Sequence, residues 1–137
     1  MKPLKIAVIG VAMLLLCHAG AGAAEKKEFT AKVDAGGVQK VEIVGGSYFF
    51  DPNYVIVKVN VPTEITFKKE PGMIPHDVVL KAPDAGIDFV LELKEEPQTV
   101  RFTPTRAGTY QFNCEKKFLF FESHKEKGMV GTLEVRE

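Results

Sequence analysis

Alternation of apolar and polar side chains is the feature of this sequence that most constrains its fold. From Glu28 onward, short runs carry an apolar residue at every second position, and Gly, Pro, Asn or Asp separates these runs. No helix-length periodic segment lies between the runs. The pattern therefore predicts an all-β fold, a Greek-key β-sandwich or barrel.

The alternation also predicts the bounds of the individual strands. We expect strands over Phe29–Val33, Val38–Val44, Tyr54–Val59, Thr63–Lys68, Asp77–Lys81, Phe89–Leu93, Thr99–Thr103, Thr109–Cys114 and Val130–Arg136. Residues typical of turns separate them, at Gly45-Gly46, Asp51-Pro52-Asn53, Glu70-Pro71-Gly72, Ala82-Pro83-Asp84, Glu95-Glu96-Pro97 and Pro104 to Gly108.

The first residues are typical of an export signal. A basic start is followed by an apolar run from Ile6 to Leu16 and then by small residues. This run is too short to span a bilayer as a stable anchor. We therefore expect a cleaved signal peptide over residues 1–24 and a periplasmic or otherwise secreted domain over residues 25–137. Cys17 offers lipid attachment as an alternative, although Leu16 is a poor fit to the small residue that such sites need.

The predicted mature chain has 137 − 24 = 113 residues, the size of one domain with one core. Two of the basic residues, Lys2 and Lys5, lie in the signal, which leaves 18 − 2 = 16 basic and 18 acidic residues. The resulting charge of −2 does not favour nucleic acid as a partner. We expect a monomer without a stable membrane span.

The mature part keeps few soft metal donors, namely His76, His124, Cys114, Met73 and Met129. Exported proteins usually pair their thiols, but Cys114 has no second cysteine in the mature chain. A single thiol in an oxidising compartment is buried and inert, paired with another chain, or bound to a metal.

Strand parity indicates where these donors lie. Cys114 comes two residues after Phe112, so its side chain lies on the same inward face of that strand. Met129 comes four residues before Leu133, so it lies on the same inward face as Leu133. Antiparallel pairing of these two strands would bring Cys114 and Met129 to the same end of the sandwich. His76 begins its own strand and reaches that end if this strand runs parallel to the last one.

His124 lies on the connection between the last two predicted strands. A thiolate, two imidazoles and a thioether suit copper, which cycles between two oxidation states in trigonal His₂Cys sites with a long axial Met. Calcium and magnesium prefer oxygen ligands. Tetrahedral zinc remains an alternative for the same Cys and two His.

These motifs resemble the cupredoxin family over nearly all of residues 45–137. The stretch from Phe102 to Cys114 is similar to the family's approach to its copper cysteine, and His124-x4-Met129-Val130-Gly131 is similar to its last ligand segment. Pro75-His76-Asp77-Val78 resembles the start of its first-histidine strand. The resemblance implies one mononuclear copper ion, with His76, Cys114 and His124 as equatorial ligands and Met129 as the axial ligand.

One departure from the family is the length of the ligand loop. Plastocyanin- and azurin-like members have only a few residues between the cysteine and the second histidine, whereas residues 115–123 lie between them here. The sequence leaves open whether Glu115 or Glu122 approaches the copper. We expect Met73 to be a packed or rim residue and not a ligand.

Residues 115–128 have no clear period, and the sequence does not decide between a short helical turn and an ordered loop. Within this segment, Phe118–Phe121 is an apolar run. We expect it to fold back onto the domain as a satellite core. The alternative is an exposed patch beside His124 on which a redox partner docks.

The expected function is one-electron transfer between redox partner proteins, whose identity the sequence does not give. The alternative is copper binding for tolerance or delivery, and a third hypothesis is a metal-free interaction module. We do not expect an enzyme, because multicopper oxidases and copper nitrite reductases need more histidines than His76 and His124 supply.

Overall fold

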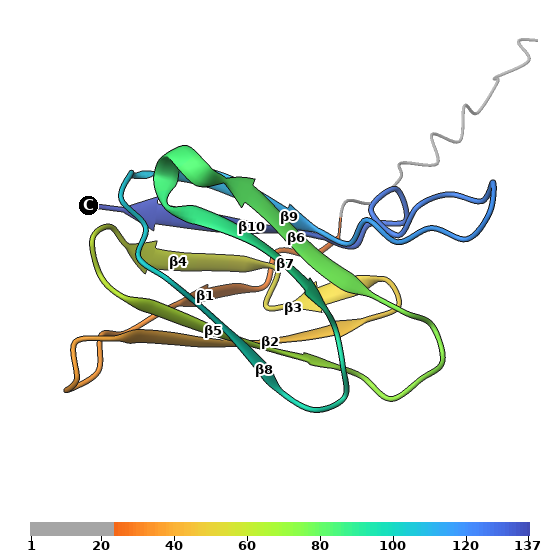
Figure 1. Cartoon of the computed structure of the whole chain (residues 1–137), viewed down its shortest axis with the longest axis horizontal. Helices are drawn as coiled ribbons and strands as arrows, with labels where there is room; N and C mark the ends of the chain where they lie inside the picture. The colour runs from red at the N-terminus through yellow and green to blue at the C-terminus, as the bar shows by residue number, and fades with distance from the viewer. Residues whose placement is uncertain (1–23) are drawn as a thin grey trace, which may run out of the picture.

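The computed structural model of the protein describes residues 24–137 (Figure 1). The predicted signal peptide lies outside these residues except for Ala24. The described part contains one short 3-10 turn, η1 (Pro83–Ala85), and no α-helix. Its strands are β1 (Glu28–Thr30), β2 (Gln39–Gly46), β3 (Phe49–Asp51), β4 (Tyr54–Lys58), β5 (Thr63–Lys69), β6 (Asp77–Ala82), β7 (Ile87–Glu92), β8 (Gln98–Phe102), β9 (Gly108–Asn113) and β10 (Val130–Arg136).

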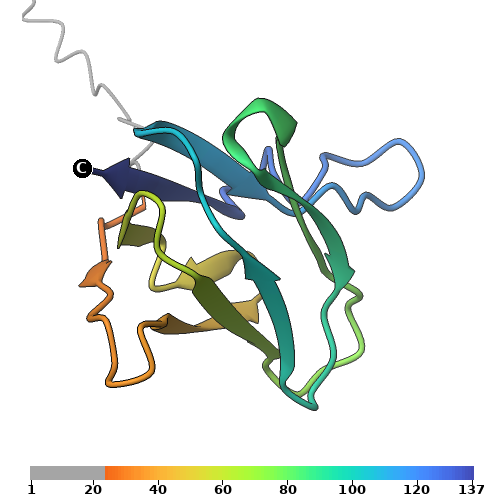
Figure 2. The ribbon, with the colours of Figure 1, turned by 60° about the vertical axis from the view of Figure 1, so that its left-hand side comes forward.

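The strands form two sheets that enclose one core (Figures 1 and 2). The larger sheet has the strand order β1-β4-β10-β9-β6-β7, and the smaller has the order β3-β2-β5-β8. Strands that are neighbours in space are often not neighbours in sequence, as with β4 and β10. The predicted all-β Greek-key sandwich is confirmed.

Burial follows the predicted alternation along the strands. In β10, Gly131, Leu133 and Val135 are buried while the residues between them are not. The inward side chains of both sheets meet in a single apolar cluster. Phe112 of β9 lies at its centre, with its ring 5.1 Å from the ring of Phe50 and 6.5 Å from the ring of Phe67. Burial of such rings is the main source of stability in a sandwich of this size.

Three strands of the larger sheet determine where the predicted metal donors lie. β9 pairs antiparallel with both β6 and β10, so β6 and β10 run parallel to each other. The start of β6, the end of β9 and the start of β10 therefore lie at one end of the sheet. This confirms the strand direction on which the predicted position of His76 depends.

The prediction of a turn at Gly45-Gly46 is wrong, and the sequence pattern missed β3. Both glycines belong to β2 and pair with Phe50 and Phe49 of β3. At these positions a neighbouring side chain approaches the backbone closely, because a Cβ on Gly45 would lie 2.6 Å from Leu93 Cδ1. The turn itself falls one step later, at Ser47 and Tyr48.

Residues 114–129 form an irregular loop of hydrogen-bonded turns between β9 and β10, and this loop extends beyond the ends of the sheets (Figure 1). Our expectation that Phe118–Phe121 folds back as a satellite core is wrong. Phe118 is 69%, Leu119 65%, Phe120 86% and Phe121 54% exposed. The run sits on the projecting part of the loop, where no element of the sandwich covers it.

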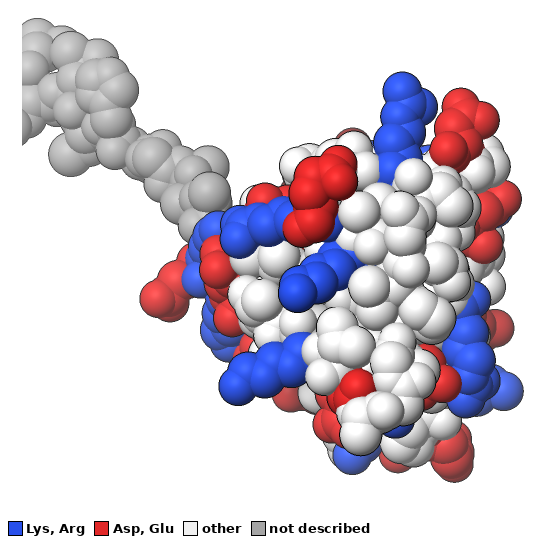
Figure 3. Space-filling view, turned by 90° about the vertical axis from the view of Figure 1, so that its left-hand side faces the viewer, with Lys and Arg blue, Asp and Glu red and all other residues white. Residues whose placement is uncertain are grey.

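Residues 24–137 include no helix that is long and apolar enough to cross a membrane. The end of the sandwich opposite the long loop faces the viewer in Figure 3. Basic and acidic side chains are intermixed there around an uncharged area, and no field of one sign covers this face.

Candidate metal centre

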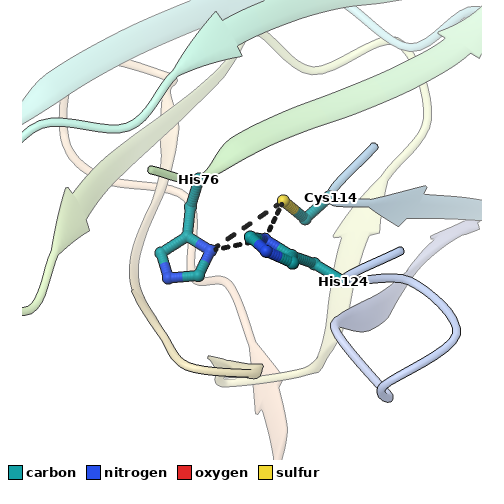
Figure 4. A group of neighbouring side chains, drawn as sticks. All are labelled: His76, Cys114 and His124. Atoms are coloured by element: carbon teal, nitrogen blue, oxygen red, sulfur yellow. Dashed lines mark hydrogen bonds between the residues drawn. The ribbon is translucent and has the colours of Figure 1, made fainter. Parts of the chain in front are cut away.

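Three predicted ligands converge at the loop end of the core (Figure 4). His76 Nδ1 lies 3.1 Å from His124 Nδ1, and Cys114 Sγ lies 3.4 Å from His124 Nδ1 and 4.0 Å from His76 Nδ1. All three side chains are buried, with exposed fractions of 2% for His76, 0% for Cys114 and 5% for His124. Three donor atoms therefore face a common point that is shielded from water.

Strand ends position two of these residues. His76 immediately precedes β6, and its carbonyl oxygen accepts a hydrogen bond from the Leu93 N–H at 2.9 Å. Cys114 immediately follows β9, and its N–H donates to the Met129 carbonyl at 3.1 Å. The sheet hydrogen bonds thus continue one residue beyond the strands and hold both backbones in place.

A compact turn positions His124 within the long loop. Ser123 and Glu126 form a reciprocal cap, since the Ser123 N–H donates to Glu126 Oε2 at 2.7 Å and the Glu126 N–H donates to Ser123 Oγ at 3.2 Å. The His124 N–H also donates to the Lys116 carbonyl at 2.9 Å. These bonds order the backbone on both sides of the histidine.

Met129 lies at the same end of the core and is fully buried. Its N–H donates to the His124 carbonyl at 2.9 Å, while its carbonyl accepts from Cys114. The backbone of Met129 therefore joins two of the three converging residues. The Met129 side chain lies directly against Gly45, because a Cβ there would come within 3.4 Å of Met129 Cε.

Two residues that the sequence analysis missed contact the histidines. Ser47 Oγ lies 3.0 Å from His76 Nε2, and a proton donated from Nε2 to this oxygen leaves the lone pair on Nδ1, toward Cys114. The Tyr48 ring packs against the His124 ring at 4.8 Å and the His76 ring at 6.1 Å. In the sequence, Ser47 and Tyr48 are marked only by their position after Gly45 and Gly46. Two glycines predict a turn but give no sign of a functional site.

Asp77 is the third missed residue, and it follows His76 directly. Its N–H points to Cys114 Sγ at 3.4 Å, and its Oδ1 accepts the Glu115 N–H at 2.7 Å. Asp77 therefore ties the start of β6 to the thiol and to the residue that follows it. A polar residue beside a predicted ligand is the signal that could have found it.

Burial keeps the metal-free site electrically neutral. Desolvation lowers the pKa of His76 to about 4, and the charge of His124 contributes to this lowering. Desolvation also lowers the pKa of His124 and raises the pKa of the Cys114 thiol to about 11. Both imidazoles thus offer lone pairs at neutral pH, whereas the thiol must lose a proton to become a ligand.

The donor set fits a metal ion of the copper or zinc type. Donors bonded at roughly 2.0–2.3 Å in a trigonal plane lie roughly 3.5–4.0 Å apart. The separations of Cys114 Sγ from the two histidines, 3.4 and 4.0 Å, are close to this range, and the two histidine nitrogens are somewhat nearer to each other, at 3.1 Å. Within the described residues, the converging group consists of His76, Cys114 and His124 alone, so neither Glu115 nor Glu122 belongs to it. Met73 is fully exposed and lies at the rim, as expected.

A pocket of about 410 Å³ leads from His124 to the surface. Its walls are mainly apolar side chains from the long loop and from the segment before β6. They include Tyr48, Met73, Ile74, Phe118 and Phe121. His124 is therefore the predicted ligand that borders an opening to solvent through this pocket.

The sequence matches the family model of the cupredoxin-like domain over residues 6–131. The chain thus belongs to the cupredoxin-like family. No curated protein sequence matches it.

Solved structures with the same fold include several copper proteins. The metal-binding domain of the Streptococcus pneumoniae D39 Cu(I)-exporting P-type ATPase CopA is 21% identical, with a TM-score of 0.61, over 82% of this chain and 99% of that one. Reduced auracyanin from Roseiflexus castenholzii is 21% identical, with a TM-score of 0.57, over 78% and 99%. The blue copper protein auracyanin A from Chloroflexus aurantiacus is 23% identical, with a TM-score of 0.53, over 73% and 100%. The family and the donor set together are consistent with copper binding.

Proposed function

We propose that this protein is an exported, mononuclear copper protein that carries single electrons between redox partner proteins and is not an enzyme. The observation that carries the proposal is the buried convergence of His76, Cys114 and His124 next to Met129. Soft donors in this combination are typical of copper sites that transfer electrons.

The hydrogen bonds around the site support this function. Electron transfer is fast when the donors move little between the two oxidation states, and hydrogen bonds to the ligands hold the donors still. Ser47 holds His76, Asp77 holds Cys114, and Ser123 with Glu126 holds the turn that carries His124. Bound copper would supply the one-electron change, while these residues keep its surroundings fixed.

The closed donor set argues against catalysis at the metal. Catalytic metal sites keep a coordination position open for water or substrate. Here Met129, whose side chain is fully buried and whose backbone is hydrogen-bonded to His124 and Cys114, would supply the fourth donor. Electrons would instead leave through His124, which borders the apolar pocket.

Spectroscopy and redox cycling of the copper-loaded protein test the proposal. We expect an intense visible absorption that disappears on reduction and returns on oxidation without loss of metal. Cys114→Ala should remove this absorption while leaving a folded sandwich, because the thiolate supplies the transition and the strands supply the core. A Cys114→Ala protein that stays intensely coloured would contradict the assignment.

The same measurement separates the alternative function. A site that releases its copper on each reduction would favour copper delivery over electron transfer. Export has a separate test, since we expect the protein recovered from the extracytoplasmic fraction to begin near Glu25.

A further inference from the structure

The long loop carries a compact group of exposed apolar side chains, which we name the apolar tip. It consists of Phe118–Phe121 together with Met73 and Ile74, which border the same pocket. Met73 is 101% and Ile74 42% exposed, and the four loop residues are at least half exposed. Contiguous apolar surface of this kind marks a site of interaction with a partner or a membrane.

The apolar tip projects from the sandwich and forms one wall of the pocket beside His124. The loop that carries it reaches past the ends of the strands in two views (Figures 1 and 2). A tight turn forms its end, closed by the Phe121 N–H donating to the Phe118 carbonyl at 3.0 Å. The rings contact each other and not the core, with 5.2 Å between Phe120 and Phe121 and 6.1 Å between Phe118 and Phe121.

Lysines flank the apolar tip, and they outnumber the acidic residues of the same loop, Glu115, Glu122 and Glu126, by one. Lys116 and Lys117 precede it, Lys125 and Lys127 follow it, and three of these four lysines border the pocket together with a single acidic residue, Glu122. None of the four lysines takes part in the ion pairs found among residues 24–137. The ammonium groups of Lys116, Lys117 and Lys125 are thus available to an anionic surface, whereas that of Lys127 lies over the Tyr48 ring at 4.5 Å.

The polypeptide enters the domain at this same end. β1 and β10 both run parallel to β4, and Glu28 and Thr132 are both in register with Tyr54. The chain before β1 therefore starts beside Met129 and the long loop. In the sequence, an apolar run from Ile6 to Leu16 precedes it. A mature chain that begins near Glu25 would therefore carry its N-terminus at the end of the sandwich that bears the apolar tip.

We infer that the apolar tip inserts into the interface of an anionic lipid bilayer. The Phe and Leu side chains enter the boundary between headgroups and acyl chains, and the flanking lysines contact lipid phosphates. A fluid bilayer accommodates a projecting apolar loop of any local shape, whereas a protein partner would need a surface that matches it. The inference goes beyond electron transfer, because it orients the metal centre toward the membrane, and it does not depend on bound copper.

A single indole in the full-length chain tests the insertion, since the protein contains no tryptophan. Phe120→Trp places the probe in the apolar tip, and Val90→Trp places it at an exposed position on β7 as the matched control. With vesicles of phosphatidylglycerol and phosphatidylcholine, we expect the fluorescence of Phe120→Trp to shift to the blue and to be quenched by brominated lipid. The control should do neither.

Because both variants share one N-terminus, attachment through that terminus alone would bind both to vesicles without a blue shift at position 120, and this result would overturn the inference. Absence of any vesicle binding would also overturn the inference, and would indicate that a protein partner binds the apolar tip. Replacing Lys116 and Lys117 by Gln should weaken binding to anionic vesicles by about fivefold per lysine. Equal binding to pure phosphatidylcholine would overturn the recognition of anionic headgroups.

Discussion

The backbone N–H of Asp77 points to the sulfur of Cys114 across 3.4 Å, which links the first residue of β6 to the residue that follows β9. The Asp77 carboxylate completes this link by accepting the Glu115 N–H at 2.7 Å. One residue thus contacts the proposed copper ligand through its backbone and fixes the neighbouring chain through its side chain.

Two substitutions at Asp77 should separate the effect of its charge on the copper reduction potential from the effect of its hydrogen bond on stability. Asp77→Asn keeps an acceptor for the Glu115 N–H but removes a negative charge near the thiolate, so we expect unchanged stability and a higher copper reduction potential. Asp77→Ala loses the acceptor as well and should lower the free energy of unfolding by about 1 kcal/mol. Redox titration and denaturant unfolding measure the two effects. A lower potential in Asp77→Asn would contradict this account.

Metal uptake should release protons from the thiol alone. The pKa of Cys114 is raised to about 11 by burial, while the pKa values of His76 and His124 are lowered, so at pH 7 only the thiol carries a proton that a metal must displace. We expect the release of about one proton per bound copper(II) ion. Titration with a pH indicator in weak buffer measures it. Release near zero would mean that Cys114 is already a thiolate.

The metal-free protein should lose stability in acid because of its buried histidines. The pKa of His76 falls from 6.5 to about 4 on folding, so between these values the unfolded chain binds more protons than the folded one. The free energy of unfolding therefore rises with pH across this window and falls as the solution is acidified through it. Thermal melts from pH 7 to pH 4 follow this change. His76→Gln should show a shallower dependence, and an identical slope would exclude His76 as its source.

Exposure of the long loop predicts that its aromatic rings add little to folding. Phe120→Ala should leave the melting temperature of the metal-free protein nearly unchanged, because the Phe120 ring is 86% exposed. Phe112→Ala is the matched control, since this ring is 1% exposed at the centre of the core and its loss should cost about 3–5 kcal/mol. A large loss of stability in Phe120→Ala would mean that the loop packs against the domain.

The sequence by itself determined most of the strands, although not β3, and the set of soft donors that the predicted mature chain offers. Period-two alternation reports which side of a strand a residue faces, and this local signal is enough to assign Cys114, His76 and Met129 to inward faces. The lone thiol of the predicted mature chain and the two histidines limited the possible metals, because donor softness is a property of the residue type.

Tertiary structure alone decided which strands are neighbours and what covers the loops. The parallel relation of β6 and β10, which brings His76 to Cys114, depends on pairing across the sheet, and local periodicity carries no information about it. Ser47 and Tyr48 reach the histidines only because β2 and β3 form a hairpin at this end. Phe118–Phe121 is exposed because no other element packs against the projecting loop, and an aperiodic segment gives no sign of that in its sequence.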